Sequence, residues 1–562
     1  MRTLAPPTRE LTRSRWVASC AVLVALVVAV IVLGDPQVFS GSDAGGKAAT
    51  VHAMADRGVD GADLGYWAED VDPLGDHHPI FHTEPREGGW IQVTSSAMPL
   101  ASSVGARVAG ALGALWLSIL AVPIGALGAA RLARRIGAPT GFLAFVVVGA
   151  ASPLTFYGAD QWEHAPALAA AIWAVALLGE KLRGLDFVWL GTAAGIAGAL
   201  RRETVLVMVV LGVIELLDRE RRQFWLRHVP GAAIAAGAAA TILVVVYRLD
   251  AAVLGQSLST RSADQAGLAG TEPGQRLYDG VLTTVSQYSN LDLPYSVIGV
   301  LTLVGVGLAA SGWARNDDAH VRMGAMLAAS SLAVRALVGG LTFVPGAFAA
   351  VPVAAAAPFL AQRRHRRLLV GCLVGTGLVI LLQWTGSLGA QWGGRYLLVP
   401  AAVVAIVALA EIERRGAREP AALVALAATA AIAVLGLVWH VERSDGVAES
   451  RDAILAAADG EVVISTHAHF PREVAASLAE QRWLLGVTVD EVVDAFGVAD
   501  RAATGERVWL LHPGTSCETD PCGRTWEERT DAEAPDGWRS TELIEVPWII
   551  GGTYVLEAFE PG

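Results

Sequence analysis

Long apolar runs separated by short polar connections dominate the chain as far as about residue 440. Most of these runs approach or exceed the roughly 20 residues with which a helix crosses about 30 Å of hydrocarbon. Because only helices and closed barrels satisfy their backbone groups in lipid, the pattern predicts an α-helical polytopic membrane protein. We expect about 13 transmembrane helices, near residues 16–34, 104–130, 140–157, 165–179, 186–200, 204–217, 229–249, 294–313, 321–341, 346–361, 368–388, 396–411 and 420–440.

Arginines mark alternate connections between these runs. Because cytoplasmic loops carry the excess of basic residues, these connections are expected to face the cytoplasm. The alternation places the N-terminus in the cytoplasm, and the 35–99 loop and the C-terminal region outside, in a multi-pass protein of the cytoplasmic (plasma) membrane. The first run is interpreted as an uncleaved anchor, since it exceeds the apolar stretch of a usual signal peptide and no clear cleavage site follows it.

The charge is divided unevenly along the chain. Only 17% of the 562 residues are charged and 53% are apolar, whereas about 25% of the residues of an average globular chain are charged. This composition excludes a soluble enzyme, a disordered chain and a coiled coil. The net charge of −12 combines −8 in the 35–99 loop, −15 in residues 441–562 and +11 in the remainder. We expect no nucleic-acid partner.

Two domains are predicted. Residues 1–440, including the 35–99 loop, form the transmembrane domain, and residues 441–562 form a small extracytoplasmic α/β domain. In the second domain, apolar and alternating runs at 461–465, 507–511 and 554–559 predict strands, and 472–482 and 491–496 predict helices. Cys517 and Cys522 are predicted to form a short-loop disulfide there, because the outer compartment is oxidising.

Ionisable residues gather at the outer ends of the apolar runs, where such groups are costly and mark function by default. Asp43 follows the first run, and an N-cap at the start of a helix is its structural alternative. Asp160, Glu163 and His164 share one short outer turn with Tyr157. A plain turn does not need so many titratable groups, which favours a functional site.

Two other outer stretches place arginines against the positive-inside trend. Arg201 and Arg202 precede Glu203, and Arg395 precedes Tyr396 at the mouth of a later run. Guanidinium groups match phosphate oxygens bidentately, so these arginines are candidate phosphate ligands. Compensation of the arginines by Glu203 is the structural alternative.

The first outer loop also contains His77, His78 and His82 among many carboxylates. The pattern His-His-x-x-x-His can ligate a divalent metal ion. An acidic, solvated loop also brings histidines and carboxylates together by chance, so both interpretations stay open. The sequence indicates no other cofactor.

The order and common sidedness of these stretches resemble the GT-C superfamily of polytopic glycosyltransferases, near the protein O-mannosyltransferases and the aminoarabinose transferases. The matching features are Asp43 in a long first outer loop, Asp160 and Glu163 in the next outer turn, GIAGALRRE at 195–203, GRYLxxP at 394–400, and an outer terminal domain. Many relatives have a second acidic residue directly after the first, where this chain has Ala44. This difference leaves the choice of base and any metal requirement open.

The resemblance implies a sugar donor linked to polyprenyl phosphate, and inverting transfer at the outer face to a lipid, glycan or protein acceptor. Such a reaction needs a base for the acceptor hydroxyl and positive charge at the leaving phosphate. We assign Asp43 as the base, with Asp160 or Glu163 orienting the acceptor or sharing that role.

The phosphate is assigned to Arg395, with Arg201 or Arg202 assisting. His164 either orients Glu163 or contacts the phosphate. The supporting residues of this prediction are His164, Tyr157, Glu203 and Tyr396.

A transporter or lipid flippase of the cell envelope is the main alternative, and a non-catalytic envelope-assembly protein is another. Transporters often contain internal repeats and interrupted helices, and we find no convincing repeat in this chain. The large 35–99 loop and the terminal domain favour the enzyme.

Overall fold

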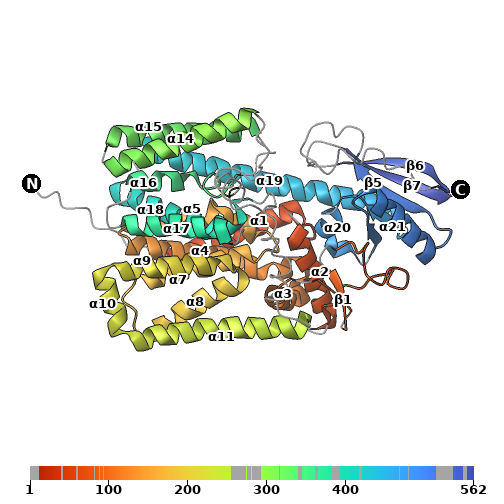
Figure 1. The fold of residues 1–562 in the computed structure, drawn as a ribbon, viewed down its shortest axis with the longest axis horizontal. Coiled ribbons are helices and arrows are strands. Elements are labelled where there is room, and N and C mark those ends of the chain that lie inside the picture. Colours follow the sequence, from red (N-terminus) through yellow and green to blue (C-terminus); the bar gives the residue numbers. More distant parts are fainter. Residues whose placement is uncertain are drawn as a thin grey trace, which may run out of the picture.

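The chain folds into a helical bundle, a layer formed by the 35–99 segment, and a C-terminal domain that contains a β-sheet (Figure 1). The computed structural model describes residues 12–39, 42–58, 61–80, 83–87, 89–92, 94–254, 274, 280, 293–315, 317–339, 345–360, 365–382, 392–416, 420–467, 469–478, 480–513, 536–547 and 553–562.

Most of the described chain is helical, as the apolar runs predict. Within the described residues, five helices are long and apolar enough to cross a membrane. The bundle helices are α1 (Arg13–Gly34), α4 (Trp116–Arg135), α5 (Phe142–Ala150), α7 (His164–Leu178), α8 (Asp186–Leu200), α9 (Glu203–Leu217), α10 (Arg219–Arg227), α11 (Val229–Leu254), α14 (Leu293–Arg315), α15 (Asp318–Gly339), α17 (Arg366–Leu382), α18 (Leu398–Arg415) and α19 (Pro420–Ala458).

Three of the expected spans are interrupted. The run at 104–130 is divided between α3 (Ala97–Ala114) and α4, and α3 itself is kinked at Ala109 and Gly110, where Gly110 has a φ of +58°. In the run at 140–157, α5 ends before Ser152, whose side chain accepts a hydrogen bond from the backbone of a new helix, α6 (Pro153–Gly158).

The third interrupted run, at 346–361, contains the short 3₁₀ helix η4 (Pro352–Ala356) and then α16 (Ala357–Leu360). Pro352 stands at the start of η4, where its fixed φ suits the first turn of a helix. Average hydropathy does not detect these breaks because the residues on both sides of each break are apolar.

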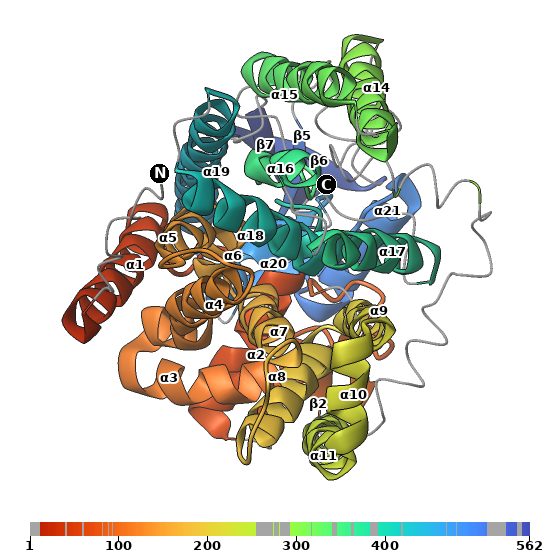
Figure 2. The ribbon, with the colours of Figure 1, turned by 90° about the vertical axis from the view of Figure 1, so that its left-hand side faces the viewer.

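Helix α18 lies at the centre of the bundle when the helices are viewed end-on (Figure 2). All its residues from Leu398 to Ile412 are buried, as expected for a helix that is apolar all round. By contrast, α11 leaves apolar side chains such as Val244 and Val245 exposed, which suits a surface in contact with lipid. The bundle therefore has a protein-buried centre and a lipid-compatible exterior.

The 35–99 segment is packed between the bundle and the C-terminal domain (Figure 1). It contains α2 (Ser42–Arg57) and a hairpin of β1 (Thr83–Arg86) and β2 (Gly89–Gln92). Residues 44–51 of α2 are all buried although the segment is acidic overall. This loop is thus a structural layer with its own contacts to both domains.

Helix α19 continues without interruption from the bundle into the C-terminal domain, across the domain boundary expected at residue 440 (Figure 1). The domain contains a sheet in the order β4-β3-β5-β7-β6, in which β3 is parallel to β4 and β5, and β7 is antiparallel to β5 and β6. The strands are β3 (Val462–Ser465), β4 (Arg482–Leu485), β5 (Val508–Pro513), β6 (Trp538–Pro547) and β7 (Thr553–Pro561).

The helices of this domain differ in part from those that the sequence predicts. The helix expected at 472–482 is replaced by α20 (Phe470–Glu473), a 3₁₀ turn at Ala475–Ser477, and the start of β4. The short turns allow Phe470 and Val474 to pack against Trp483 and the sheet. The helix expected at 491–496 is present within α21 (Val489–Ala502), which begins at a capping box formed by Thr488 and Glu491.

Glu413, near the end of α18, fixes the start of α5. Its carboxylate accepts hydrogen bonds from the backbone N–H groups of Thr140 (2.8 Å), Gly141 (3.0 Å) and Leu143 (3.3 Å). The first N–H groups of a helix have no partner within the helix, so this carboxylate satisfies groups that are otherwise unpaired.

We predict that Glu413→Ala destabilises the protein by about 1–3 kcal/mol, because it leaves several backbone donors without their acceptor. Glu413→Gln keeps one acceptor oxygen and should lose less. Thermal unfolding of the purified protein in detergent measures both variants. An unchanged melting temperature for Glu413→Ala would contradict the role of this carboxylate.

Candidate functional site

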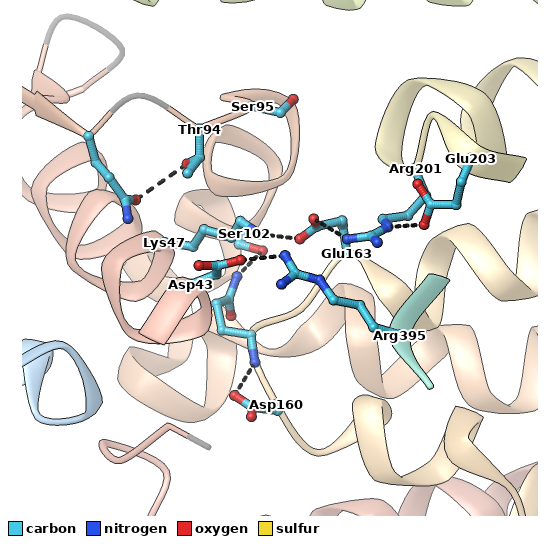
Figure 3. Close-up of polar contacts among 12 residues, drawn as sticks. Asp43, Lys47, Thr94, Ser95, Ser102, Asp160, Glu163, Arg201, Glu203 and Arg395 are labelled. Carbon is cyan, nitrogen blue, oxygen red and sulfur yellow. Dashed lines mark hydrogen bonds and ion pairs between the residues drawn. The ribbon is translucent and has the colours of Figure 1, made fainter. Parts of the chain in front are cut away.

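Four of the outer stretches singled out in the sequence meet at one place (Figure 3). The Nη2 atom of Arg395 donates to Oδ2 of Asp43 over 2.5 Å, and Lys47 forms an ion pair with Glu163. Glu163 also faces Arg201, with 3.4 Å between Oε1 and Nη1. These four elements are far apart in sequence, so the fold itself assembles a network of alternating charges.

The network continues from Arg201 to the start of α9. The Nε atom of Arg201 donates to Oε1 of Glu203 over 2.6 Å. The structural alternative considered for Glu203 is therefore present, because this carboxylate compensates Arg201. Arg201 also lines a narrow pocket, so the same side chain is compensated by a carboxylate and contributes to a pocket wall.

Two aromatic side chains hold the cations in place. Trp162 lies 5.0 Å from Nζ of Lys47 and 5.2 Å from the guanidinium carbon of Arg395. Tyr396 lies 4.9 Å from the guanidinium of Arg201 and 5.3 Å from that of Arg395. Cations at such distances from an aromatic ring are attracted by its quadrupole, so each cation keeps its position without a full set of carboxylate partners.

Local backbone features aim these side chains at one another. Asp43 and Lys47 are four residues apart on α2 and therefore project from the same face. Arg395 begins the 3₁₀ helix η6 (Arg395–Leu397) directly after Gly393 and Gly394, which have φ angles of +80° and +66°. A Cβ on Gly393 would lie 2.4 Å from the ring of Pro153. The turn thus requires glycine to bring Arg395 to the site.

A narrow pocket opens between the two arginines. It is lined by His164, Ala167, Leu168, Arg201, Glu203, Thr204, Val207, Arg395, Tyr396, Leu398 and Val399. Nη2 of Arg201, Nε of Arg395 and both ring nitrogens of His164 are buried without a hydrogen-bond partner among the residues that the structure describes. The pocket therefore combines unpaired N–H donors with walls of apolar side chains.

His164 is held by stacking. Its ring lies 4.6 Å from that of Tyr157 at an interplanar angle of 20°, and Tyr157 donates its hydroxyl hydrogen to the carbonyl of Trp392 over 2.7 Å. Tyr157 is thereby a structural support for His164.

The two carboxylates nearest the cations are ionised at neutral pH. Burial would raise the pKa of Asp43, but the positive charges of Arg395, Lys47 and Arg472 outweigh burial and hold that pKa well below its usual range. Burial would likewise raise the pKa of Glu163, and Lys47 and Arg201 lower it on balance. Both side chains are therefore acceptors in the resting protein.

Asp160 lies apart from the ion pairs of Asp43 and Glu163 (Figure 3). Its carboxylate accepts a hydrogen bond of 2.7 Å from the backbone of Gln161, whose side chain donates to Ser102 over 3.0 Å. Arg202, in contrast, is exposed and interacts electrostatically with Asp250. The structure thus separates Arg202 from the pocket and keeps Arg201 and Arg395 in it.

The histidines considered as metal ligands have structural partners. Nδ1 of His77 lies 2.8 Å from the carbonyl oxygen of Leu485, and His78 stacks on Trp90 at 5.4 Å. His82 lies outside the described residues, as do Cys517 and Cys522. Among the described residues, no group of three or more His, Cys, Asp and Glu side chains is placed to hold a metal ion.

The surroundings of Asp43 do not fit a divalent cation. Three positive side chains, Lys47, Arg395 and Arg472, act on this carboxylate. A further positive ion at the same carboxylate would be repelled by all three. Positive charge at this site is therefore supplied by the protein's own side chains.

Sequence reasoning did not assign Lys47, Trp162 or Arg472 to the site. The sequence did contain a signal for Lys47, because the chain has only two lysines and this one falls in the segment expected to lie outside. Trp162 gave no signal, because tryptophan is an ordinary residue at membrane interfaces. Arg472 belongs to a polar domain, where an arginine is not unusual.

Comparison with known proteins gives one group of structural matches. No family model matches the chain, and no curated protein matches it. The chain is similar to ArnT from Cupriavidus metallidurans in the apo state (14% identity, 97% of this chain and 98% of that chain, TM-score 0.42) and bound to undecaprenyl phosphate (14% identity, the same coverage, TM-score 0.39). ArnT is a GT-C aminoarabinose transferase, one of the groups that the sequence resembles.

We predict a pH-dependent loss of stability in Asp43→Asn. A carboxylate whose pKa is lower in the folded than in the unfolded state stabilises the protein above the unfolded pKa. Asp43→Asn should therefore melt at a lower temperature than wild type at pH 7. The difference should shrink as the pH falls below about 4, where unfolded carboxylates take up protons. Melting curves from pH 7 to pH 3 test this, and a difference independent of pH would contradict it.

Proposed function

We propose that the chain is a membrane glycosyltransferase that transfers a sugar from a polyprenyl-phosphate donor to an acceptor at the outer face of the cytoplasmic membrane. One observation carries this proposal: Arg201 and Arg395, each with a buried N–H group that lacks a partner among the described residues, line the same pocket, and Arg395 is also paired with the carboxylate of Asp43. Buried donors without acceptors are costly and call for a ligand that accepts hydrogen bonds.

The pocket favours a phosphate attached to an apolar chain. Guanidinium groups bind phosphate oxygens through charge-assisted hydrogen bonds, and His164 supplies further nitrogen atoms at the same wall. The other walls are apolar side chains of α7, α9 and α18. The cavity itself measures only about 10 Å³, so the side chains of its walls must move apart when a phosphate with a polyprenyl chain binds. Such a ligand suits the chemistry of the walls, because its headgroup needs cations and its tail needs apolar contacts.

The proposed reaction is a single displacement. The acceptor hydroxyl oxygen attacks the anomeric carbon of the sugar, and its proton passes to the carboxylate of Asp43. The bond between the anomeric carbon and the phosphate oxygen breaks, and polyprenyl phosphate leaves with the electron pair. Arg395 and Arg201 stabilise the negative charge that develops on that oxygen. Attack opposite the leaving group inverts the anomeric configuration.

Donor binding is also expected to change the pKa of Asp43. In the resting protein Arg395 is paired with Asp43, and this pairing helps to keep the pKa of the carboxyl too low for efficient proton transfer. A donor phosphate competes for the same guanidinium and adds negative charge beside the carboxylate. Both effects raise the pKa of Asp43, so the base becomes effective when the donor is bound.

The remaining groups orient the reactants. Glu163 holds Lys47 and Arg201 in place and thereby supports the phosphate side of the site. Asp160 lies apart from these ion pairs (Figure 3), and we assign it the role of orienting the acceptor. The acceptor is a lipid, glycan or protein that presents a hydroxyl group from outside.

We expect Asp43→Asn to reduce transfer by about 10²–10⁴-fold, the range that a positioned general base contributes. Asp160→Asn should reduce transfer less, because Asp160 orients the acceptor and does not take its proton. The assay measures transfer from radiolabelled polyprenyl-phosphate sugars to membrane acceptors. Full activity of both variants, with normal membrane insertion, would refute the site. Movement of lipid or solute without transfer would favour a transporter or flippase.

We expect Arg395→Gln to raise the KM for the donor about 10–100-fold, since a hydrogen bond to a charged group contributes about 1.5–3 kcal/mol. The KM for the acceptor should change little. Arg202→Gln is the matched control, because Arg202 is an outer arginine outside the pocket. A larger effect on acceptor than on donor binding would mean that the two sides of the site are reversed.

A further inference from the structure

The C-terminal domain directly contacts helix α2, which carries Asp43 and Lys47. Helices α2 and α20 pack together, and the backbone N–H of Phe39 donates to the carbonyl of Glu473 over 3.1 Å. A Cβ on Gly45 would lie 1.5 Å from the carbonyl oxygen of Arg472. The two backbones are thus in close contact two residues beyond Asp43, and only glycine permits this contact.

The positive charge of Arg472 connects this contact with Asp43. Its side chain is buried, and its Nη2 atom lies 2.9 Å from Nδ1 of His469. Its charge acts on Asp43 and on Glu473. Burial lowers the pKa of Arg472 to about 10, although the charges of Asp43 and Glu473 act to raise it. The guanidinium is therefore still charged at neutral pH. A buried charge of this kind requires negative partners.

Neighbouring residues fix α20 in this position. Glu473 is buried and forms an ion pair with Arg443 of α19. Burial raises the pKa of Glu473. Its Oε2 atom has no hydrogen-bond partner within the described part of the chain. Arg443 therefore anchors α20 to the long helix, while the backbone of Arg472 contacts α2 at Gly45.

We propose that Arg472 is a positioning residue for Asp43, supplied by the C-terminal domain, so that the active site is complete only when this domain is docked. This inference rests on the proposed function for its catalytic consequence. Arg395 binds Asp43 from the donor side, and Arg472 approaches from the domain side. When the donor phosphate engages Arg395, Arg472 and Lys47 keep the carboxylate ionised and oriented toward the acceptor.

The role of Arg472 predicts a specific pH effect. The groups whose charges act on Asp43 are Lys47 on its own helix, Arg395 on η6, and Arg472 on α20, and Asp43 in turn acts on His469. Without Arg472, only Lys47 and Arg395 oppose the effect of burial on the pKa of Asp43. The pKa of Asp43 should then rise, and the acidic limb of the kcat/KM profile should move to higher pH.

The test uses the full-length protein with radiolabelled polyprenyl-phosphate sugars between pH 4 and pH 8. Arg472→Gln should lower kcat about tenfold because the carboxylate loses its orientation, with little change in the donor KM and an acidic limb at higher pH. Arg472→Lys should restore most of both properties. Arg539→Gln is the control, since Arg539 is an exposed arginine of the same domain. A kcat and an acidic limb like those of wild type in Arg472→Gln would overturn the inference.

A second pair of variants tests the docking without removing a charge. Gly45→Ala should force α20 away from α2 and move the acidic limb in the same direction as Arg472→Gln. Gly212→Ala is its control, because a Cβ there meets no atom within 4 Å. A wild-type profile in Gly45→Ala would show that the contact does not position Asp43.

A double-mutant cycle separates this inference from the proposed function. Melting temperatures of Asp43→Asn, Arg472→Gln and the double variant measure the coupling of the two side chains without any reaction. We expect the loss in the double variant to be smaller than the sum of the single losses. Additive losses would overturn the inference even if the enzyme transfers sugar. Coupling in a protein without transferase activity would overturn the proposed function alone.

Discussion

The ion pair between Asp43 and Arg395 is the contact on which the arrangement of the site depends. Each of these charges is partly buried at one end of the bundle, where an uncompensated charge is expensive. The pair therefore requires α2 to lie over the N-terminal end of α18, which directly follows Arg395 and η6. Lys47, on the same face of α2, then meets Glu163, and the whole 35–99 segment becomes a packed layer. One electrostatic requirement thus connects the first outer loop, the central helix and the turn before α7.

The cations of this network are held firmly but are not fully satisfied. Aromatic rings and single carboxylates fix their positions, while Arg201 and Arg395 each have a buried N–H group without a partner in the described structure. A protein selected for stability alone would pair or remove these groups. Local rules are commonly broken at functional sites, and the unpaired donors share one pocket. We therefore interpret the incomplete pairing as a binding surface prepared for an anion.

The sequence allowed the prediction of those site residues that conflict with their surroundings. Asp43, Glu163, Arg201 and Arg395 stand out because charges are unusual beside apolar runs. Arg201 and Arg202 are equivalent in sequence, and only the end of α8 determines which of them faces the pocket. Arg472 could not be predicted, because its role comes from the docking of two domains. The breaks in the expected spans were missed for a related reason: hydropathy averages over single residues such as Ser152 and Gly110.

The long helix α19 explains how a separate domain reaches the site. Its 39 residues extend over about 58 Å at 1.5 Å per residue, roughly twice the hydrocarbon thickness of a bilayer. The helix alone would carry the sheet away from the membrane. Ion pairs from Arg443 to Glu473 and from Arg451 to Asp35 instead tie the emerging part of α19 to α20 and to the end of α1. The domain is therefore held where the charge of Arg472 acts on Asp43.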